Sequence, residues 1–184
     1  MVLALIQNVA LIVLLAAVQQ YLRRRLRGRP ALERLLAGVL YGGIAVVGMM
    51  TPFVFAPGLI YDGRSIILGL AGLLGGGSVA AVAAGIALVY RLSLGGIGAA
   101  AGAVTIIAAA TLGAAFRHWY RRRPRELRAS ELLMFGLVVH GVMVLLQYTL
   151  LPDGIGVQVV RTLGPVILTL FPLGTMFAAR LIIE

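Results

Sequence analysis

Two arginines in a long apolar stretch carry the strongest chemical signal in this sequence. Arg64 completes the tripeptide Asp62-Gly63-Arg64, and between Arg64 and Arg117 the only charged residue is Arg91. A charge at the centre of a bilayer costs about 2.5–3.5 kcal/mol, so an isolated arginine must lie at a membrane edge or in a polar cavity. Guanidinium groups bind carboxylates through two parallel hydrogen bonds. Arg64 and Arg91 therefore predict a site for a small carboxylate.

Three further features are candidates for completing this site. Gly95 and Gly96 precede a predicted helix whose free N–H groups would face the same pocket, which is an arrangement that binds anions. Thr105 lies two turns further along and could close the pocket floor with its hydroxyl. His140 and Gln147 are seven residues apart, so they share a helix face, and an intramembrane polar face is by default a functional hypothesis.

A purely structural alternative stays open for these residues. Arg64 could pair with Asp62 or with a lipid phosphate instead of a ligand. Arg91 could extend its charged end to the membrane surface while its stem stays in the apolar region. His140 could be a structural hydrogen-bonding residue.

No group of residues in the sequence predicts catalysis. Cysteine is absent, which excludes disulfides and thiolate chemistry. The glycines of Gly72–Gly77 lack the Lys-Ser/Thr pair of a phosphate-binding loop. His118 and His140 are the only histidines, and neither has a carboxylate at metal-ligand spacing. We therefore expect no enzymatic activity, no cofactor and no metal site.

The composition places these residues in a membrane protein. Of the 184 residues, 61% are hydrophobic and 12% are charged, with a mean hydropathy of +1.03. Soluble domains carry about 25% charged residues. Several windows of roughly 20 residues hold almost no charge, which is enough to cross about 30 Å of hydrocarbon. The sequence predicts one all-α domain over residues 1–184, a polytopic helical membrane protein embedded in the lipid bilayer.

The arginines also indicate an orientation. All 16 basic residues are arginine, the net charge is +10, and most of them fall in two clusters at residues 23–29 and 117–128. Such clusters flanking apolar runs mark cytoplasmic loops under the positive-inside rule, so they do not indicate a nucleic-acid partner. We expect a multi-pass protein of the inner membrane of a bacterium, with the N-terminus outside and the C-terminus in the cytoplasm.

Five full spans and a pair of short central helices fit this topology. Because both clusters lie on one side, the chain between them crosses an even number of times. Residues 65–92 then cross twice or form a re-entrant hairpin, and Gly75–Gly77 divide them, since each glycine costs a helix about 1 kcal/mol relative to alanine. Residues 51–61 are expected to lie against the outer face. The predicted helices are Val2–Gln20, Ala31–Met50, Ser65–Leu74, Ser78–Leu92, Gly98–Phe116, Met134–Leu151 and Leu163–Ile183.

The central segment resembles a known family of membrane receptors. Its motifs are Asp62-x-Arg64, Gly72-Leu-Leu-Gly-Gly-Gly and Tyr90-Arg91-Leu-Ser-Leu-Gly-Gly96, followed by a helix of small residues. They are similar to those of the five-transmembrane receptor domain of the LytS/YhcK type, and Arg91-x-x-x-Gly-Gly is the most specific element. That family often has Asn-x-Arg where this chain has Asp62, which leaves the net charge of the pocket open. The resemblance also implies a likeness to the solute-binding subunits of vitamin uptake transporters.

The resemblance implies a function in signal transduction. In that family the domain is the membrane input module of sensor histidine kinases and diguanylate cyclases. We therefore expect a receptor that binds a small anionic or polar ligand from the outer side and relays the signal through the last helix to a cytoplasmic output domain. The output domain is expected to be absent from this chain, and a homodimer is expected for a kinase-type receptor. The alternative is a small-solute-binding membrane subunit of a transporter.

Overall fold

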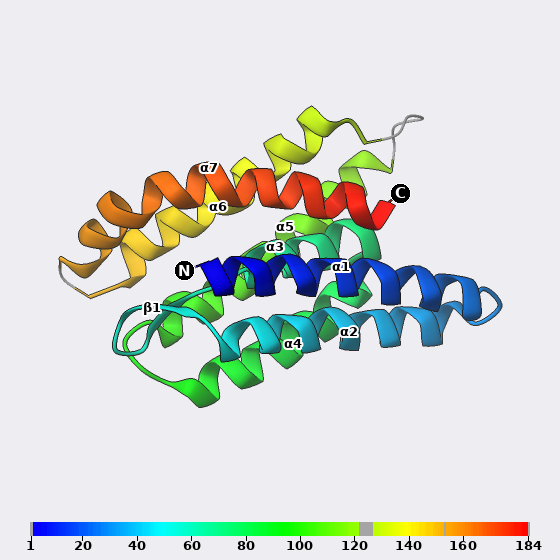
Figure 1. The fold of residues 1–184 in the computed structure, drawn as a ribbon, viewed down its shortest axis with the longest axis horizontal. Coiled ribbons are helices and arrows are strands. Elements are labelled where there is room, and N and C mark those ends of the chain that lie inside the picture. Colours follow the sequence, from blue (N-terminus) through cyan, green and yellow to red (C-terminus); the bar gives the residue numbers. More distant parts are fainter. Residues whose placement is uncertain (1, 122–126, 153, 184) are drawn as a thin grey trace.

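The computed structural model describes residues 2–121, 127–152 and 154–183, with side chains from residue 10 onward. In these residues, seven helical segments run back and forth along one elongated bundle (Figure 1). We call the end that carries residues 23–34 and 117–121 the basic end, and the end that carries residues 51–64 and 91–98 the hairpin end. The elements are α1 (Val2–Arg25), α2 (Pro30–Met50), β1 (Phe53–Ala56), β2 (Leu59–Tyr61), α3 (Arg64–Leu70), the π-helix η1 (Ala71–Gly75), α4 (Gly77–Leu94), α5 (Ala99–Tyr120), α6 (Ala129–Leu150) and α7 (Ile155–Ile183).

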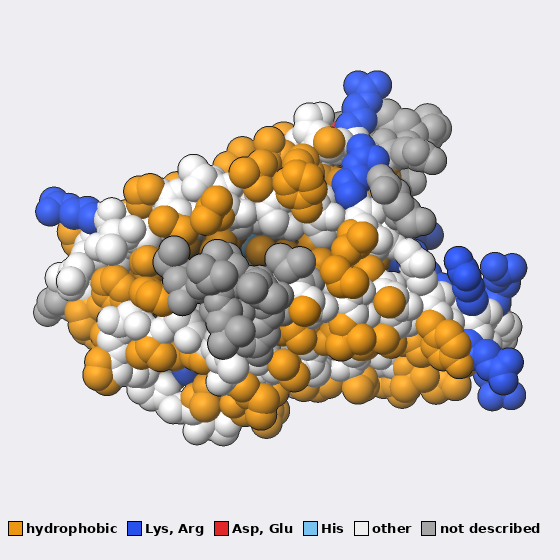
Figure 2. Space-filling view, viewed as in Figure 1, with side chains coloured by type: hydrophobic (Ala, Val, Ile, Leu, Met, Phe, Trp, Pro, Cys, Tyr) orange, Lys and Arg blue, Asp and Glu red, His pale blue; other side chains and the backbone are white. Residues whose placement is uncertain are grey.

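The outer surface of the bundle is suited to lipid. In the described part of the chain, α2, α4, α5, α6 and α7 are long and apolar enough to cross a membrane. Large apolar side chains such as Val89, Leu145 and Phe177 are exposed on these helices. In Figure 2 apolar side chains cover much of the visible face, while arginines gather mainly at the basic end. Apolar surface of this extent marks a membrane contact, so the predicted all-α polytopic membrane fold is confirmed.

The two central helices differ in length, which corrects one prediction. α4 has 18 residues and is long enough to span, so the expectation that both central helices are short was wrong for the second of them. The first is short, as expected, because the seven residues of α3 continue into only five residues of η1. Gly76 then ends the segment with a φ of +87°, a conformation that favours glycine. The chain turns at the predicted glycines.

The segment formed by α3 and η1 passes from the hairpin end to the basic end. It begins with Arg64 at the hairpin end. Near its other end, the carbonyls of Leu73 and Leu74 accept hydrogen bonds from Arg117 Nη1 at 3.0 and 2.6 Å. Every residue from 64 to 74 is buried, so neighbouring helices shield this short segment. This segment and α4 therefore run in opposite directions between the two ends of the bundle.

Close packing of glycines holds the short segment against α5. Gly69 of α3 lies directly against Gly113 of α5, with no space for a side chain between the two backbones. One turn further along, a Cβ on Gly72 would come within 2.5 Å of backbone atoms of Ala110 and Ala114. Small residues at such contacts allow helix backbones to approach closely, which replaces the hydrophobic driving force that is missing within lipid. The small-residue composition of α5 therefore determines where the buried segment lies.

A β-hairpin covers the end of the bundle that bears Arg64. β1 pairs antiparallel with β2, placing Phe53 opposite Tyr61. The turn contains Pro57 followed by Gly58 with a φ of +76°, and this order of residues suits a type II turn. We expected residues 51–61 to lie against the end of the domain, but the sequence analysis did not foresee two strands.

The remaining helices lie within a few residues of the predicted spans except at one boundary. α7 begins at Ile155 rather than Leu163, so it reaches 29 residues. Pro165 and Pro172 lie inside it, and Gly136 of α6 packs directly against Pro172. The predicted span Val2–Gln20 falls within α1, whose side chains up to residue 9 lie outside the described part.

Candidate ligand site at the hairpin end

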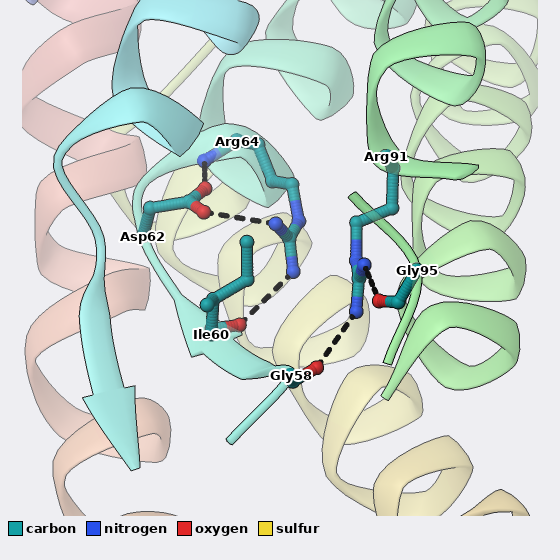
Figure 3. Close-up of polar contacts among 6 residues, drawn as sticks. All are labelled: Gly58, Ile60, Asp62, Arg64, Arg91 and Gly95. Atoms are coloured by element: carbon teal, nitrogen blue, oxygen red, sulfur yellow. Dashed lines mark hydrogen bonds and ion pairs between the residues drawn. The ribbon is translucent and has the colours of Figure 1, made fainter. Parts of the chain in front are cut away.

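The two predicted arginines lie together beneath the β-hairpin. Their side chains are almost fully buried, with Arg64 4% exposed and Arg91 1% exposed. Figure 3 shows both guanidinium groups extending toward the same short stretch of chain. Arg64 Nη2 donates to the carbonyl of Ile60 at 3.2 Å, and Arg91 Nη2 donates to the carbonyl of Gly58 at 3.2 Å. The hairpin turn is thus bound by arginines from two different helices.

Asp62 neutralises one of these two charges. Its Oδ2 lies 2.9 Å from Arg64 Nη1, and its Oδ1 accepts a hydrogen bond from the Arg64 backbone N–H at 2.9 Å. Burial raises the pKa of Asp62 above its usual value, and the charges of Arg64 and Arg91 oppose the rise. The pairing that the structural alternative foresaw is therefore present. It leaves the second guanidinium without a carboxylate partner among the described residues.

Arg91 packs closely against two glycines, Gly98 just before α5 and Gly102 in its first turn. A Cβ on Gly102 would come 2.5 Å from Arg91 Nε, and a Cβ on Gly98 would come 3.3 Å from its Nη2. Arg91 Nη1 donates to the carbonyl of Gly95 at 2.9 Å. Its Nε is buried, and within the described part of the chain it has no hydrogen-bond partner. A buried charge with an unsatisfied donor is unfavourable, so an anion reaching this group would be bound strongly.

Gly96, just before α5, crosses closely over the hairpin turn. A Cβ on Gly96 would lie 2.5 Å from Gly58 Cα. The N–H of Gly98 donates to the carbonyl of Gly58 at 3.3 Å, and that of Ala99 donates to the carbonyl of Gly96 at 3.0 Å. These two N–H groups are therefore satisfied within the protein, while the anion cradle expected at the start of α5 stays a prediction.

Thr105 and His140 are buried nearby but use their polar atoms for structural bonds. The Thr105 hydroxyl donates to the carbonyl of Ala101, one turn back in its own helix, at 2.7 Å. His140 Nδ1 lies 2.8 Å from the carbonyl of Gly136, which can only accept, so Nδ1 carries the proton. Nε2 lies 3.1 Å from the Ser65 hydroxyl. His140 therefore joins α6 to the residue that follows Arg64.

Several residues of this site escaped the sequence analysis. The Tyr61 hydroxyl donates to Gln147 Oε1 at 3.3 Å, and Ser65 bonds His140, so the polar face predicted for α6 meets the hairpin and α3. Burial raises the pKa of Tyr61 to about 12, so this donor stays protonated. The sequence offers one signal for these two residues: Tyr61 lies next to Asp62 in the chain, and Ser65 lies next to Arg64.

Replacing Tyr61 by phenylalanine should destabilise the protein by about 1–3 kcal/mol, because the buried oxygen of Gln147 then lacks a donor. Thermal unfolding of the purified protein in detergent would measure this. Tyr148, which is 56% exposed on the same helix as Gln147, provides the matched control, and its change to phenylalanine should be neutral. An unchanged midpoint for the Tyr61 variant would show that the bond contributes nothing.

Comparison with known proteins identifies the family of this chain. The family model described as "5TMR of 5TMR-LYT", the five-transmembrane receptor of LytS-type proteins, matches residues 15–184. The searches of curated proteins and of solved structures returned no match. The matched region includes every element of the site and nearly all of the bundle. The chain therefore belongs to the five-transmembrane receptor domain family of the 5TMR-LYT type, a membrane-embedded sensory input module.

Proposed function

We propose that this domain senses a small extracytoplasmic carboxylate, which binds between Arg64 and Arg91. The observation that carries the proposal is the charge balance beneath the hairpin: two buried guanidiniums face one carboxylate, that of Asp62. Backbone carbonyls of Gly58, Ile60 and Gly95 accept from other donors of the two guanidiniums, and Arg91 Nε has no partner in the described part of the chain. An ionised acceptor forms hydrogen bonds roughly twice as strong as a neutral one, so a carboxylate would compete favourably for these donors.

Ligand entry requires that the hairpin move, because both arginines are buried under it. A carboxylate that took over the Nη donors would release the carbonyls of Gly58 and Ile60 and open the turn. The two arginines would then exchange two neutral acceptors, the carbonyls of the hairpin, for one charged acceptor, the carboxylate. The state with the hairpin raised would bind the anion better than the closed state, and this differential affinity is what a ligand needs to shift a population.

The hydrogen bonds between the site and α6 provide a route to the last helix. Tyr61 and Ser65 bond Gln147 and His140 on α6, and α6 packs along α7. Movement of the hairpin or of Arg64 would therefore disturb α6 directly. We propose that α7 carries this change to a cytoplasmic output domain, a histidine kinase or a diguanylate cyclase, which functions as a homodimer.

The orientation follows from the arginines. Placing the basic end in the cytoplasm satisfies the positive-inside rule and puts the hairpin end outside the inner membrane of a bacterium. The N-terminus would then lie outside and the C-terminus inside, and residues 1–184 would form a single sensor domain.

Titration of a panel of mono- and dicarboxylates against the protein in lipid nanodiscs would test this function. A ligand that binds the wild type should bind the Arg64→Gln and Arg91→Gln variants at least about tenfold more weakly, since hydrogen bonds to charged groups are worth about 1.5–3 kcal/mol. Arg161→Gln removes an exposed arginine of α7 near the same end and should leave affinity unchanged. Wild-type affinity in both site variants would exclude this site.

A further inference from the structure

A second charged cavity opens at the basic end, far along the bundle from Arg64. Its volume is about 270 Å³, large enough for a small group and its hydration. Three arginines line it: Arg34 of α2, Arg117 of α5 and Arg121, which directly follows α5. Gly76, just before α4, and Ser78, in its first turn, complete this part of the lining. The described residues that line it include no carboxylate. The cavity therefore has a strongly positive potential.

The geometry of Arg117 shows that one of these charges is fixed in place. Its Nη1 donates to the carbonyls of Leu73 and Leu74, which terminate η1. Its stem passes beside Gly76, where a Cβ would lie 3.2 Å from Nε. Arg34 and Arg121 line the same cavity as Arg117. A cationic group held beside like charges is unfavourable unless an anion joins them, because like charges at close range repel.

The first turn of α4 adds to this positive potential. α4 has 18 residues and begins at Gly77, and no side chain caps its N-terminus. A helix N-terminus carries roughly half a positive charge and presents free N–H groups. Ser78, in the first turn, places a hydroxyl in the lining of the same cavity.

We propose that this cavity binds a phosphate group with net negative charge, supplied either by an anionic lipid headgroup or by a free phosphorylated solute. Guanidinium groups form bidentate hydrogen bonds with phosphate oxygens. Arginines arriving from two helices can contact a tetrahedral anion from different directions. The location also fits a lipid headgroup, because basic pockets between helices at a membrane surface bind such groups. This site is separate from the carboxylate site at the hairpin end and does not depend on it.

The test compares two double variants of equal charge, with the purified protein in a neutral detergent. Arg34→Gln with Arg121→Gln removes two charges from the cavity, and both side chains lie at the surface, so the fold should persist. Arg24→Gln with Arg161→Gln removes two exposed arginines that do not line the cavity. Thermal unfolding is followed during titration with phosphatidylglycerol, with phosphatidylcholine and with glycerol 3-phosphate, at constant ionic strength.

The wild type and the Arg24/Arg161 variant should be stabilised by at least one of the two anionic probes. The apparent affinity of the Arg34/Arg121 variant should be at least about tenfold lower, as expected for loss of charged hydrogen bonds. Stabilisation by phosphatidylglycerol alone would identify a lipid headgroup, and stabilisation by glycerol 3-phosphate would identify a soluble ligand. Equal losses in both double variants, equal stabilisation by phosphatidylcholine, or no stabilisation by either anionic probe would overturn the proposal.

Discussion

Replacing Gly113 by alanine should destabilise the protein by about 3 kcal/mol or more, which is at the upper end for overpacking of a core. A Cβ at this position would overlap the carbonyl oxygen of Gly69 and lie 3.0 Å from the backbone nitrogen of Leu73. Both obstacles are backbone atoms in buried helices, so no side-chain rotation can relieve the contact. α5 and the segment formed by α3 and η1 would have to separate along their whole contact.

Chemical or thermal unfolding in detergent would measure this loss, and Gly85 offers a matched control. Gly85 lies exposed inside α4, and a Cβ there would have no neighbour within 4 Å. Its change to alanine should leave stability unchanged or raise it by about 0.5–1 kcal/mol through helix propensity. Equal effects at the two positions would show that the close approach of α3 to α5 does not govern stability.

The second large effect is expected at Gly96, where the hairpin turn crosses the connection between α4 and α5. Gly96 has a φ of +84°, and a Cβ would lie 2.5 Å from the Cα of Gly58. An alanine here meets both backbone strain and a backbone clash, so we expect a loss of about 2–4 kcal/mol. Separation at this crossing would also remove the bond from Arg91 to the carbonyl of Gly58. Under the proposed function, affinity for the carboxylate should then rise, because the closed state that competes with binding is weakened.

A variant at the neighbouring Gly95 distinguishes the effect of backbone strain from that of a steric clash. It also has a positive φ, +61°, but a Cβ would meet nothing within 4 Å. Alanine at Gly95 should therefore cost only the conformational strain, about 1–2 kcal/mol. Unfolding in detergent, together with the rate of proteolytic cleavage within residues 53–61, would compare the two variants. Faster cleavage is expected for the Gly96 variant alone. Similar rates for the two variants would show that the contact between Gly96 and Gly58 does not hold the hairpin in place.

The proximity of Arg64 and Arg91 could be predicted from the sequence, because a charge in an apolar run must lie at a membrane edge or in a polar cavity. The helix break at Gly76 was predictable for a similar reason, since consecutive glycines weaken a helix at a definite place. The backbone acceptors of the two arginines were not predictable, unlike the carboxylate of Asp62. The carbonyls of Gly58 and Ile60 belong to the backbone, and any residue type would have supplied them.

The lengths of the helices were harder to predict than their existence. α4 gains its span from Gly77 at its start and Leu94 at its end, and neither residue carries a strong signal for helix. The β-hairpin was missed because its strands are short and apolar, and Pro57 reads equally well as a loop residue. The N–H of Gly98 bonds the carbonyl of Gly58, which is distant in the chain, and no local sequence signal indicates this contact.

The segment from Arg64 to Gly75 has a consequence for the relation between the two ends of the molecule. It is about 18 Å long at 1.5 Å per residue and is buried from Arg64 to Leu74, with the proposed carboxylate site at one end and the rim of the basic cavity at the other. A displacement of Arg64 along this segment would have one of two effects. It would move Gly75 by a similar amount, or the wider turn of the π-helix that ends at Gly75 would absorb it. Occupants of the two sites would then influence each other's affinity reciprocally, although neither touches the other.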